Sequence, residues 1–177
     1  KAHDLRRIVP YINCSESAAI LSHAKSIIGW HLNHKFCSCC GAMSFSYEGG
    51  QRRKCKECDA SHFPRTDPVA ISLVVDRQTQ SVLLGRQSFW PAGRYSCVAG
   101  FVDVSETLEQ AVAREIFEET GVVVNNVDYI SSQNWPNYSQ LMLATISYVD
   151  GQQQVKLNDK ELEDARWFTL QQLIDTT

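Results

Sequence analysis

The chain has 177 residues, of which 44% are hydrophobic and 21% charged, so it is long enough to bury one ordinary core. Its formal net charge of −3 argues against binding nucleic acid mainly through bulk positive charge. The sequence has no apolar run of about 18 residues that would span a bilayer. It lacks an initiator methionine and stops within a periodic segment, so we expect a piece of a longer protein.

The first predicted element is a helix over residues 15–34. Apolar side chains recur there at helical spacing, at Ile20, Ala24 and Ile28. Either Ser15 or Ser17 is available to cap its start.

Two cysteine pairs follow this helix. Four of the seven cysteines form two C-x-x-C pairs separated by fourteen residues: Cys37 and Cys40, then Cys55 and Cys58. This spacing is typical of a tetrahedral Zn²⁺ site, which we favour over a redox pair or unrelated buried thiols. Cys39 is then a spare thiol, and we expect the isolated Cys14 and Cys97 to be buried like small hydrophobic residues. Unpaired thiolates and zinc imply a reducing intracellular compartment; the cytoplasm, peroxisome and mitochondrion all fit.

Residues 35–63 have few large apolar side chains, so we expect this segment to need the metal in order to fold. It carries a basic string: Arg52, Arg53, Lys54 and Lys56. The string is either a phosphate contact of a nucleic-acid-binding ribbon or a solvated strand face. The net negative charge of the whole chain favours the solvated face. Since four cysteines are available as ligands, we expect the flanking histidines to be ordinary polar residues: His23, His31, His34 and His62.

After residues 63–68, where two prolines break regular structure, strand-like runs alternate with polar turns. The predicted strands cover residues 69–75, 81–86, 95–101, 122–124, 127–131, 141–148 and 165–168. Helices are predicted over residues 108–120 and 170–174. This order predicts an α+β fold with a mixed β-sheet flanked by helices.

The helix over residues 108–120 combines good caps with a conflict in its pattern. Thr107 and Gln110 form a capping box, and Gly121 follows the predicted end. The apolar stripe begun by Leu108 and Val112 continues onto glutamates: Glu115 and Glu119, with Glu118 beside them. These like charges repel, and Arg114 alone cannot neutralise three of them. A hard divalent cation would neutralise these carboxylates, so we favour a metal site over a solvated acidic face.

The segment from Gly100 to Val122 resembles the complete Nudix box, with Glu106 and the run from Arg114 to Gly121 at the specified positions. The resemblance implies an α/β/α sandwich with a mixed sheet and hydrolysis of a nucleoside diphosphate linked to another group. It implies that Glu115, Glu118 and Glu119 bind Mg²⁺ or Mn²⁺. It also implies that Arg114 orients these three glutamates and that Glu106 supports them. We assign the general base to Glu119.

A four-cysteine ribbon directly before such a domain resembles the NADH pyrophosphatase group, which includes enzymes that remove NAD caps from RNA. The segment from Ser132 to Pro136 is similar to that group's S-Q-P-W-P marker, with Asn134 in place of the first proline. The later marker positions also depart, at Asn137, Tyr138 and Gln140.

The same resemblance implies the remaining site residues. Residues 161–168 resemble the group's metal-binding strand, which implies a further ligand at Glu161, with Glu163 as the fallback. Phe101 matches a base-stacking phenylalanine, and Phe63 matches an aromatic residue donated by the second subunit of a homodimer. The pocket candidates are Gln133, Trp135 and Ala99. Core packing is the alternative for each aromatic residue.

We therefore expect a leading segment and helix in residues 1–34, a zinc ribbon in 35–63 and a Nudix hydrolase domain in 64–177. The expected function is metal-dependent hydrolysis of the pyrophosphate bond of NAD(H), giving nicotinamide mononucleotide and AMP, with NAD-capped RNA as a larger substrate. One alternative is a Nudix hydrolase that prefers ADP-ribose, FAD or coenzyme A. The other is a nucleic-acid-binding protein with a silent Nudix domain.

Overall fold

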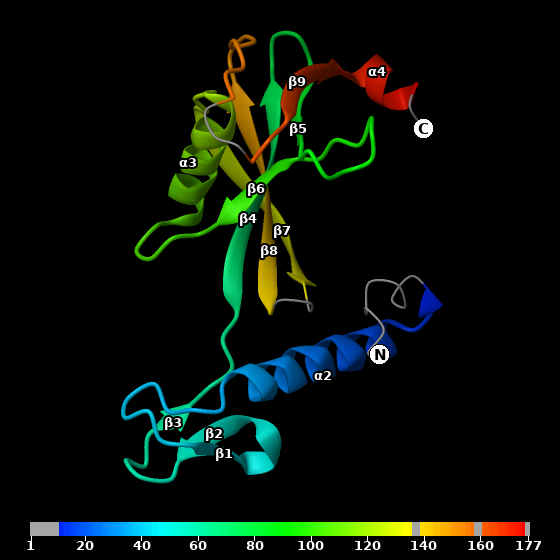
Figure 1. The fold of residues 1–177 in the computed structure, drawn as a ribbon. Helices are drawn as coiled ribbons and strands as arrows, with labels where there is room; N and C mark the ends of the chain where they lie inside the picture. The colour runs from blue at the N-terminus through cyan, green and yellow to red at the C-terminus, as the bar shows by residue number, and fades with distance from the viewer. Residues whose placement is uncertain (1–10, 136–138, 158–160, 176–177) are drawn as a thin grey trace. The chain divides into compact units, whose positions relative to one another are not determined.

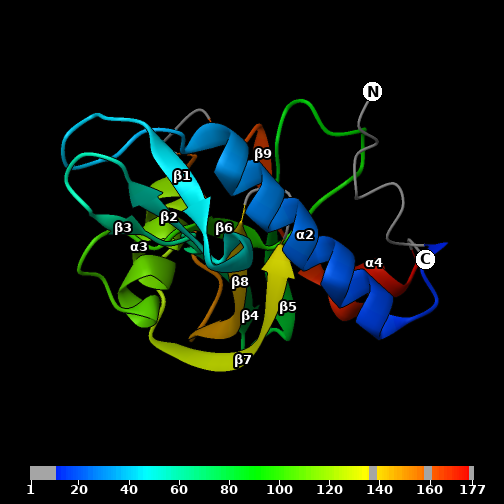
Figure 2. The same cartoon turned by 90° about the horizontal axis from the view of Figure 1, so that it is seen from below.

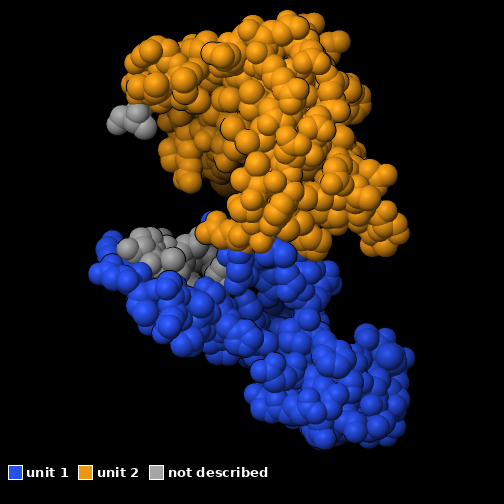
Figure 3. Space-filling view, turned by 180° about the vertical axis from the view of Figure 1, so that it is seen from behind, with its two compact units in different colours: residues 1–67, 134–141 blue, residues 68–133, 142–177 orange. Residues whose placement is uncertain are grey.

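A computed structural model of the chain describes residues 11–135, 139–157 and 161–175. The chain forms two compact units, drawn blue and orange in Figure 3. Unit 1 comprises residues 1–67 and 134–141, and unit 2 comprises residues 68–133 and 142–177. Residues 1–10 of the expected leading segment lie outside the described residues, as do Pro136, Asn137 and Tyr138 of the marker.

The described part of unit 1 contains one long helix and a small antiparallel sheet. Its elements are α2 (Ser15–Asn33), β1 (Ser44–Tyr47), the 3₁₀ turn η2 (Glu48–Gly50), β2 (Arg52–Cys55) and β3 (Ser61–His62). The three strands lie side by side in the order β1-β2-β3, as Figure 1 and Figure 2 show. We call residues 35–63, which contain this sheet, the ribbon. No helix in the described part of the chain combines the length and apolarity needed to cross a membrane.

The predicted first helix is confirmed, but its predicted cap is wrong. Cys14 is the N-cap residue and makes no side-chain cap bond. The helical hydrogen bonds start from its carbonyl, which accepts from Ala18 N–H at 3.0 Å. Ser15 and Ser17 therefore already lie within the helix. Cys14 is exposed and Cys97 is half-buried, so the expectation that both are buried is also wrong.

Unit 2 is built on a six-stranded sheet. Its elements are β4 (Asp67–Asp76), β5 (Ser81–Arg86), β6 (Val98–Phe101), α3 (Leu108–Thr120), β7 (Asn126–Trp135), β8 (Gln140–Val149), β9 (Asp164–Thr169) and α4 (Leu170–Ile174). The first residue of β4, the last two of β7 and the first two of β8 are counted with unit 1. The strand order is β7-β8-β4-β5-β9, and β6 pairs with β4.

The sheet is mixed, as predicted. Strand β4 pairs antiparallel with both β5 and β6. In its contacts with β8, by contrast, the residue numbers rise in the same direction along both strands. The Thr145 hydroxyl donates to the Ile71 carbonyl at 3.2 Å, and Arg77 N–H donates to the Val149 carbonyl at 3.2 Å. The pair β4–β8 is therefore parallel.

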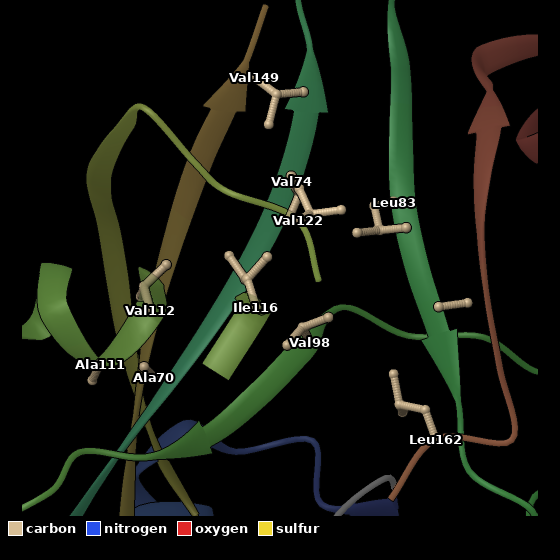
Figure 4. Close-up of a cluster of buried hydrophobic side chains, with 11 residues drawn as sticks. Ala70, Val74, Leu83, Val98, Ala111, Val112, Ile116, Val122, Val149 and Leu162 are labelled. Atoms are coloured by element: carbon tan, nitrogen blue, oxygen red, sulfur yellow. The ribbon is translucent and has the colours of Figure 1, made fainter. Parts of the chain in front are cut away.

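Helix α3 covers one face of this sheet (Figure 1). Its Val112 and Ile116 side chains pack into a buried cluster with Val74, Leu83 and Val98 from the strands (Figure 4). Ile116, Val74 and Leu83 are fully buried. This packing fixes which side of α3 faces the sheet, and so where its acidic side chains lie.

Three predicted strands differ from the structure. The strand predicted over residues 127–131 is extended to β7 (Asn126–Trp135). Residues 122–124 form no strand. Val122 is buried in the core cluster, and Val124 packs against that cluster. The strand predicted over residues 95–101 is shortened to β6. Ser96 makes only an isolated bridge to Gly85.

Candidate active site

The two ends of α3 are set by its caps. Thr107 accepts a hydrogen bond from the N–H of Gln110, and the Gln110 side chain accepts one from the N–H of Thr107. Gly121 ends the helix in the left-handed conformation at φ 71°, which glycine adopts at little steric cost. The capping box and the glycine end are confirmed, and they define the orientation of each glutamate around the helix.

The three glutamates of the stripe differ in exposure. Glu119 is 4% exposed, the Glu115 side chain 16% and the Glu118 side chain 52%. The stripe therefore continues from apolar residues onto two largely buried carboxylates, while Glu118 lies at its solvent edge. Burial of a carboxylate is costly unless donors or cations compensate it.

Arg114 connects the acidic side chains around it. Its Nε and one terminal nitrogen donate to the two carboxylate oxygens of Glu106, at 2.7 and 2.9 Å. The other terminal nitrogen donates to Glu115 at 2.9 Å and to Glu118 at 3.0 Å. The main-chain carbonyl of Phe101 accepts a further bond at 2.9 Å. The guanidinium is thus held in one orientation, with three carboxylates bonded to it.

The same arrangement shifts the pKa values of Glu106 and Glu115 in opposite directions. The hydrogen bonds from Arg114, with a further bond from Asp103 N–H, lower the pKa of Glu106 to about 2. Burial raises the pKa of Glu115, and this effect outweighs that of Arg114; the negative charges of Glu118 and Glu161 add to it. The ionised form of Glu115 would therefore be stabilised by additional positive charge close to it.

Strand β6 supports Glu115 through a glycine. A Cβ atom built on Gly100 would lie 1.9 Å from the Glu115 carboxyl carbon and 2.1 Å from one of its oxygens. Only a residue without a side chain lets the strand and the carboxylate approach so closely. The sequence pattern contains Gly100, but this packing role was missed because no local signal links the two residues.

The two late glutamates have different surroundings. The charge of Glu161 acts on Glu115 and helps raise its pKa. Glu163 forms an ion pair with Arg86 instead, and its N–H donates to the Arg86 carbonyl at 2.9 Å. These contacts favour Glu161 over Glu163 as an additional member of the acidic cluster.

The substrate-binding candidates are divided between the units. Phe101, Ala99 and Gln133 belong to unit 2, and Phe63 and Trp135 belong to unit 1. Phe101 is 52% exposed and Phe63 is 63% exposed. Neither ring is taken up by core packing, which was the alternative for these residues.

The four cysteines of the two pairs come together in the ribbon. Their sulfur atoms all lie within 4.8 Å of one another: Cys37, Cys40, Cys55 and Cys58. Burial opposes ionisation of Cys37, but the N–H groups of Cys40 and Cys39 and contacts with His62 and Cys58 lower its pKa to about 5. Four soft sulfur ligands at this separation fit a tetrahedral Zn²⁺ ion.

The basic string does not form one solvated face. Arg53 is 9% exposed and donates to the Ser44 hydroxyl at 2.8 Å and to His31 Nδ1 at 3.0 Å. The expectation is wrong for this residue because alternate side chains of a strand point to opposite faces. His62 lies beside the cysteine cluster, with its Nε2 3.2 Å from the Cys37 sulfur, but among the described residues the group that could hold a metal ion consists of the four cysteines.

The sequence matches the NUDIX domain family over residues 65–177. The chain therefore belongs to the Nudix hydrolase family. A NUDIX hydrolase of known structure from Nitrosomonas europaea is similar in fold, with a TM-score of 0.65 and 25% identity, covering 78% of this chain and 79% of that one.

Curated relatives are more similar in sequence. The chain is 40% identical to the NAD-capped RNA hydrolase NUDT12 of Macaca fascicularis over 168 residues, which are 90% of this chain and 36% of the relative. It is 39% identical to the human mitochondrial NAD(P)H pyrophosphatase NUDT13 over 168 residues, which are 94% of this chain and 47% of the relative. The chain thus spans between a third and a half of the length of these relatives.

Proposed function

We propose that the chain hydrolyses the pyrophosphate bond of NAD(H), giving nicotinamide mononucleotide and AMP, and also removes NAD caps from RNA. The observation that carries the proposal is the cluster of carboxylates arranged around Arg114 on the Nudix helix. The names of the relatives, an NAD-capped RNA hydrolase and an NAD(P)H pyrophosphatase, support the substrate class.

Nudix hydrolases use divalent metals, and we propose that the metal here is Mg²⁺ or Mn²⁺. Its proposed ligands are the carboxylates of Glu115, Glu118, Glu119 and Glu161. The donor set fits, because hard cations prefer oxygen ligands and the single charge of Arg114 leaves most of the negative charge uncompensated. When bound, such a cation neutralises phosphate charge and lowers the pKa of a bound water molecule.

The chain's own residues then have distinct roles. Arg114 holds Glu115 and Glu118 in position, and Glu106 holds Arg114 through two parallel hydrogen bonds. Glu119 takes a proton from the attacking water molecule while the oxygen of that water forms a bond to one phosphorus atom. The anhydride P–O bond breaks, and the second phosphate leaves with the bonding electrons.

The exposed aromatic rings suit the bases of a dinucleotide. We propose that Phe101 stacks on a base and that Phe63 is supplied by the second subunit of a homodimer. The remaining proposed pocket residues are Gln133, Trp135 and Ala99. In the ribbon, the four clustered cysteines are proposed to hold a structural Zn²⁺ ion, which implies a reducing compartment. We propose that the chain is divided into a leading segment and helix (residues 1–34), the zinc ribbon (35–63) and the Nudix hydrolase domain (64–177).

Incubation with NADH and Mg²⁺ or Mn²⁺, followed by detection of AMP, tests the proposal. We expect AMP and reduced nicotinamide mononucleotide in equal amounts. Glu119→Gln should abolish turnover without loss of folding, whereas Glu109→Gln, on an exposed residue of the same helix, should leave turnover unchanged. Absence of product from every dinucleotide tested would contradict the proposal.

One observation favours a second candidate within the same chemistry. Asn134 stands where the marker of the NADH pyrophosphatase group has proline, at the end of strand β7. A change there would alter base selection and move the preference to ADP-ribose, FAD or coenzyme A. A panel of these compounds, ranked by kcat/KM against NADH, distinguishes the two candidates.

A further inference from the structure

Strands β1 and β2 of the ribbon place aromatic and basic side chains on one face. In their antiparallel register Phe45 lies opposite Lys54, and Tyr47 lies opposite Arg52. Residues directly opposite each other share a face of the sheet. Arg53 and the other buried residues of the two strands alternate with them and belong to the opposite face. We call the four residues Phe45, Tyr47, Arg52 and Lys54 the ribbon face.

The rings of the ribbon face are accessible and lie close to its cations. Phe45 is 39% exposed and Tyr47 is 40% exposed, and their ring centres are 6.4 Å apart in an edge-to-face arrangement. The Arg52 guanidinium lies 4.9 Å from the centre of the Tyr47 ring, and the Lys54 ammonium lies 5.6 Å from it. An apolar row continues this strand through Met43, which is 57% exposed and bridged to Phe36.

The charges of the ribbon face have weak partners that a stronger ligand can replace. Arg52 pairs with Glu48, whose side chain is 55% exposed, and Lys54 pairs with Asp59, whose side chain is 82% exposed. The Arg52 and Lys54 side chains are themselves 28% and 29% exposed, but each acidic partner is open to solvent, and ion pairs at the surface contribute little to stability. A polyanion that brings several phosphates would therefore compete well for both cations.

We propose that the ribbon face binds the single-stranded RNA body that follows the NAD cap, an inference that rests on the proposed function. Bases stack on Phe45 and Tyr47 while phosphates contact Arg52 and Lys54. The sheet of the RNA-recognition motif binds single-stranded RNA by stacking bases on its exposed aromatic residues, and aromatic–base stacking tolerates many sequences. A second copy of the chain fits less well, because its contact would have to bury the cations beside the rings.

The first experiment measures the affinity of the full chain for a short uncapped single-stranded RNA, without added divalent metal. Tyr47→Ala should weaken binding roughly 5- to 150-fold, because it removes one stacking partner. Tyr47→Phe keeps the ring and should bind like the wild type. Arg52→Ala should lower the slope of log affinity against log salt by about 0.7. Arg77→Ala is the matched control, since Arg77 stacks 3.9 Å from the Tyr148 ring in unit 2.

The second experiment compares kcat/KM for NADH and for NAD-capped RNA in the same variants. We expect Tyr47→Ala to lose activity on capped RNA only, with unchanged zinc content as the check on folding. Equal activity of Tyr47→Ala and wild type on capped RNA, or equal affinity for uncapped RNA, would overturn the inference. Dissociation of a dimer by Tyr47→Ala would also overturn it and assign the face to a second copy.

The two proposals fail in different ways. If the wild type hydrolyses neither NADH nor capped RNA, the proposed function is wrong, and the affinity for uncapped RNA still tests the ribbon face alone. If both substrates are hydrolysed and the ribbon variants behave like the wild type, only the ribbon-face inference is wrong.

Discussion

The carboxylate of Glu115 occupies the space in which any side chain at residue 100 would lie. A Cβ atom on Gly100 would be 1.9 Å from the Glu115 carboxyl carbon, far inside van der Waals contact. Strand β6 and helix α3 therefore meet at this pair, and the backbone of one supports the acidic group of the other.

Gly100→Ala should lower kcat by about 100-fold, because Glu115 must leave its position and a misplacement of this size has that order of effect. The measurement is kcat and KM for NADH, with thermal unfolding as a parallel readout. Unchanged kcat would show that the position of Glu115 is not required for turnover.

Two other glycines provide matched controls for this substitution. A Cβ on Gly85 would lie 2.8 Å from the tip of Leu162, so Gly85→Ala should lower stability while activity persists at lower temperature. Gly29 has nothing within 4 Å of its Cβ position in helix α2, so Gly29→Ala should be neutral or stabilise by about 0.5–1 kcal/mol.

Arg114→Lys should lower kcat/KM by about 100-fold or more although the charge is kept. A lysine cannot hold both oxygens of Glu106 and also reach Glu115 and Glu118. Kinetics over a range of metal concentrations should show a raised metal requirement. Arg77→Lys, outside the acidic cluster, should behave like the wild type.

Glu161→Gln and Glu163→Gln form a matched pair two residues apart. Glu161 acts on Glu115, whereas Glu163 pairs with Arg86. We expect Glu161→Gln to weaken metal activation and lower kcat. Glu163→Gln should leave kcat within about twofold of the wild type, because Glu163 pairs with Arg86 and is not among the groups that act on Glu115. The reverse order of effects would assign the role to Glu163.

Cys55→Ser should remove the zinc, whereas Cys39→Ser should retain it. Cys55 belongs to the cluster of four sulfurs, and Cys39 does not. Elemental analysis should give about one zinc per chain in the wild type and in Cys39→Ser. Loss of zinc from both variants would show that Cys39 also contributes.

Asp76 should make folding stability depend on pH. Burial alone would raise its pKa, but hydrogen bonds from Thr79, Gln78 N–H and Gly151 N–H together lower it. Its contribution is therefore complete at a pH above the unfolded value of about 3.9 and is lost as pH falls through the folded value.

Asp76→Asn should accordingly be less stable than the wild type at neutral pH, with a gap that narrows on acidification below about pH 4. Denaturant unfolding at several pH values measures this. The exposed Asp128→Asn serves as control and should show a much smaller gap. A gap for Asp76→Asn that widens in acid would contradict the prediction.

Helix α3 illustrates what local sequence can predict. Its limits, Leu108–Thr120, follow from the capping box and Gly121, which act between near neighbours in the chain. Strand β5 also agrees with its predicted limits, since a polar turn precedes it and its side chains alternate. The cap of α2 was predicted wrongly, because several polar residues compete there and only the final hydrogen bonds decide between them.

The sequence by itself determined the Nudix box, the two cysteine pairs and the acidic stripe, because each is a spacing of residue types within one short segment. Only the tertiary structure decided that Gly100 supports Glu115, that Glu161 rather than Glu163 acts on that carboxylate, and that Arg53 turns inward while Arg52 and Lys54 face outward. The physical reason is that these relationships depend on strand register and on helix-to-sheet packing. Those are set by the burial of the whole core and not by near neighbours in the chain.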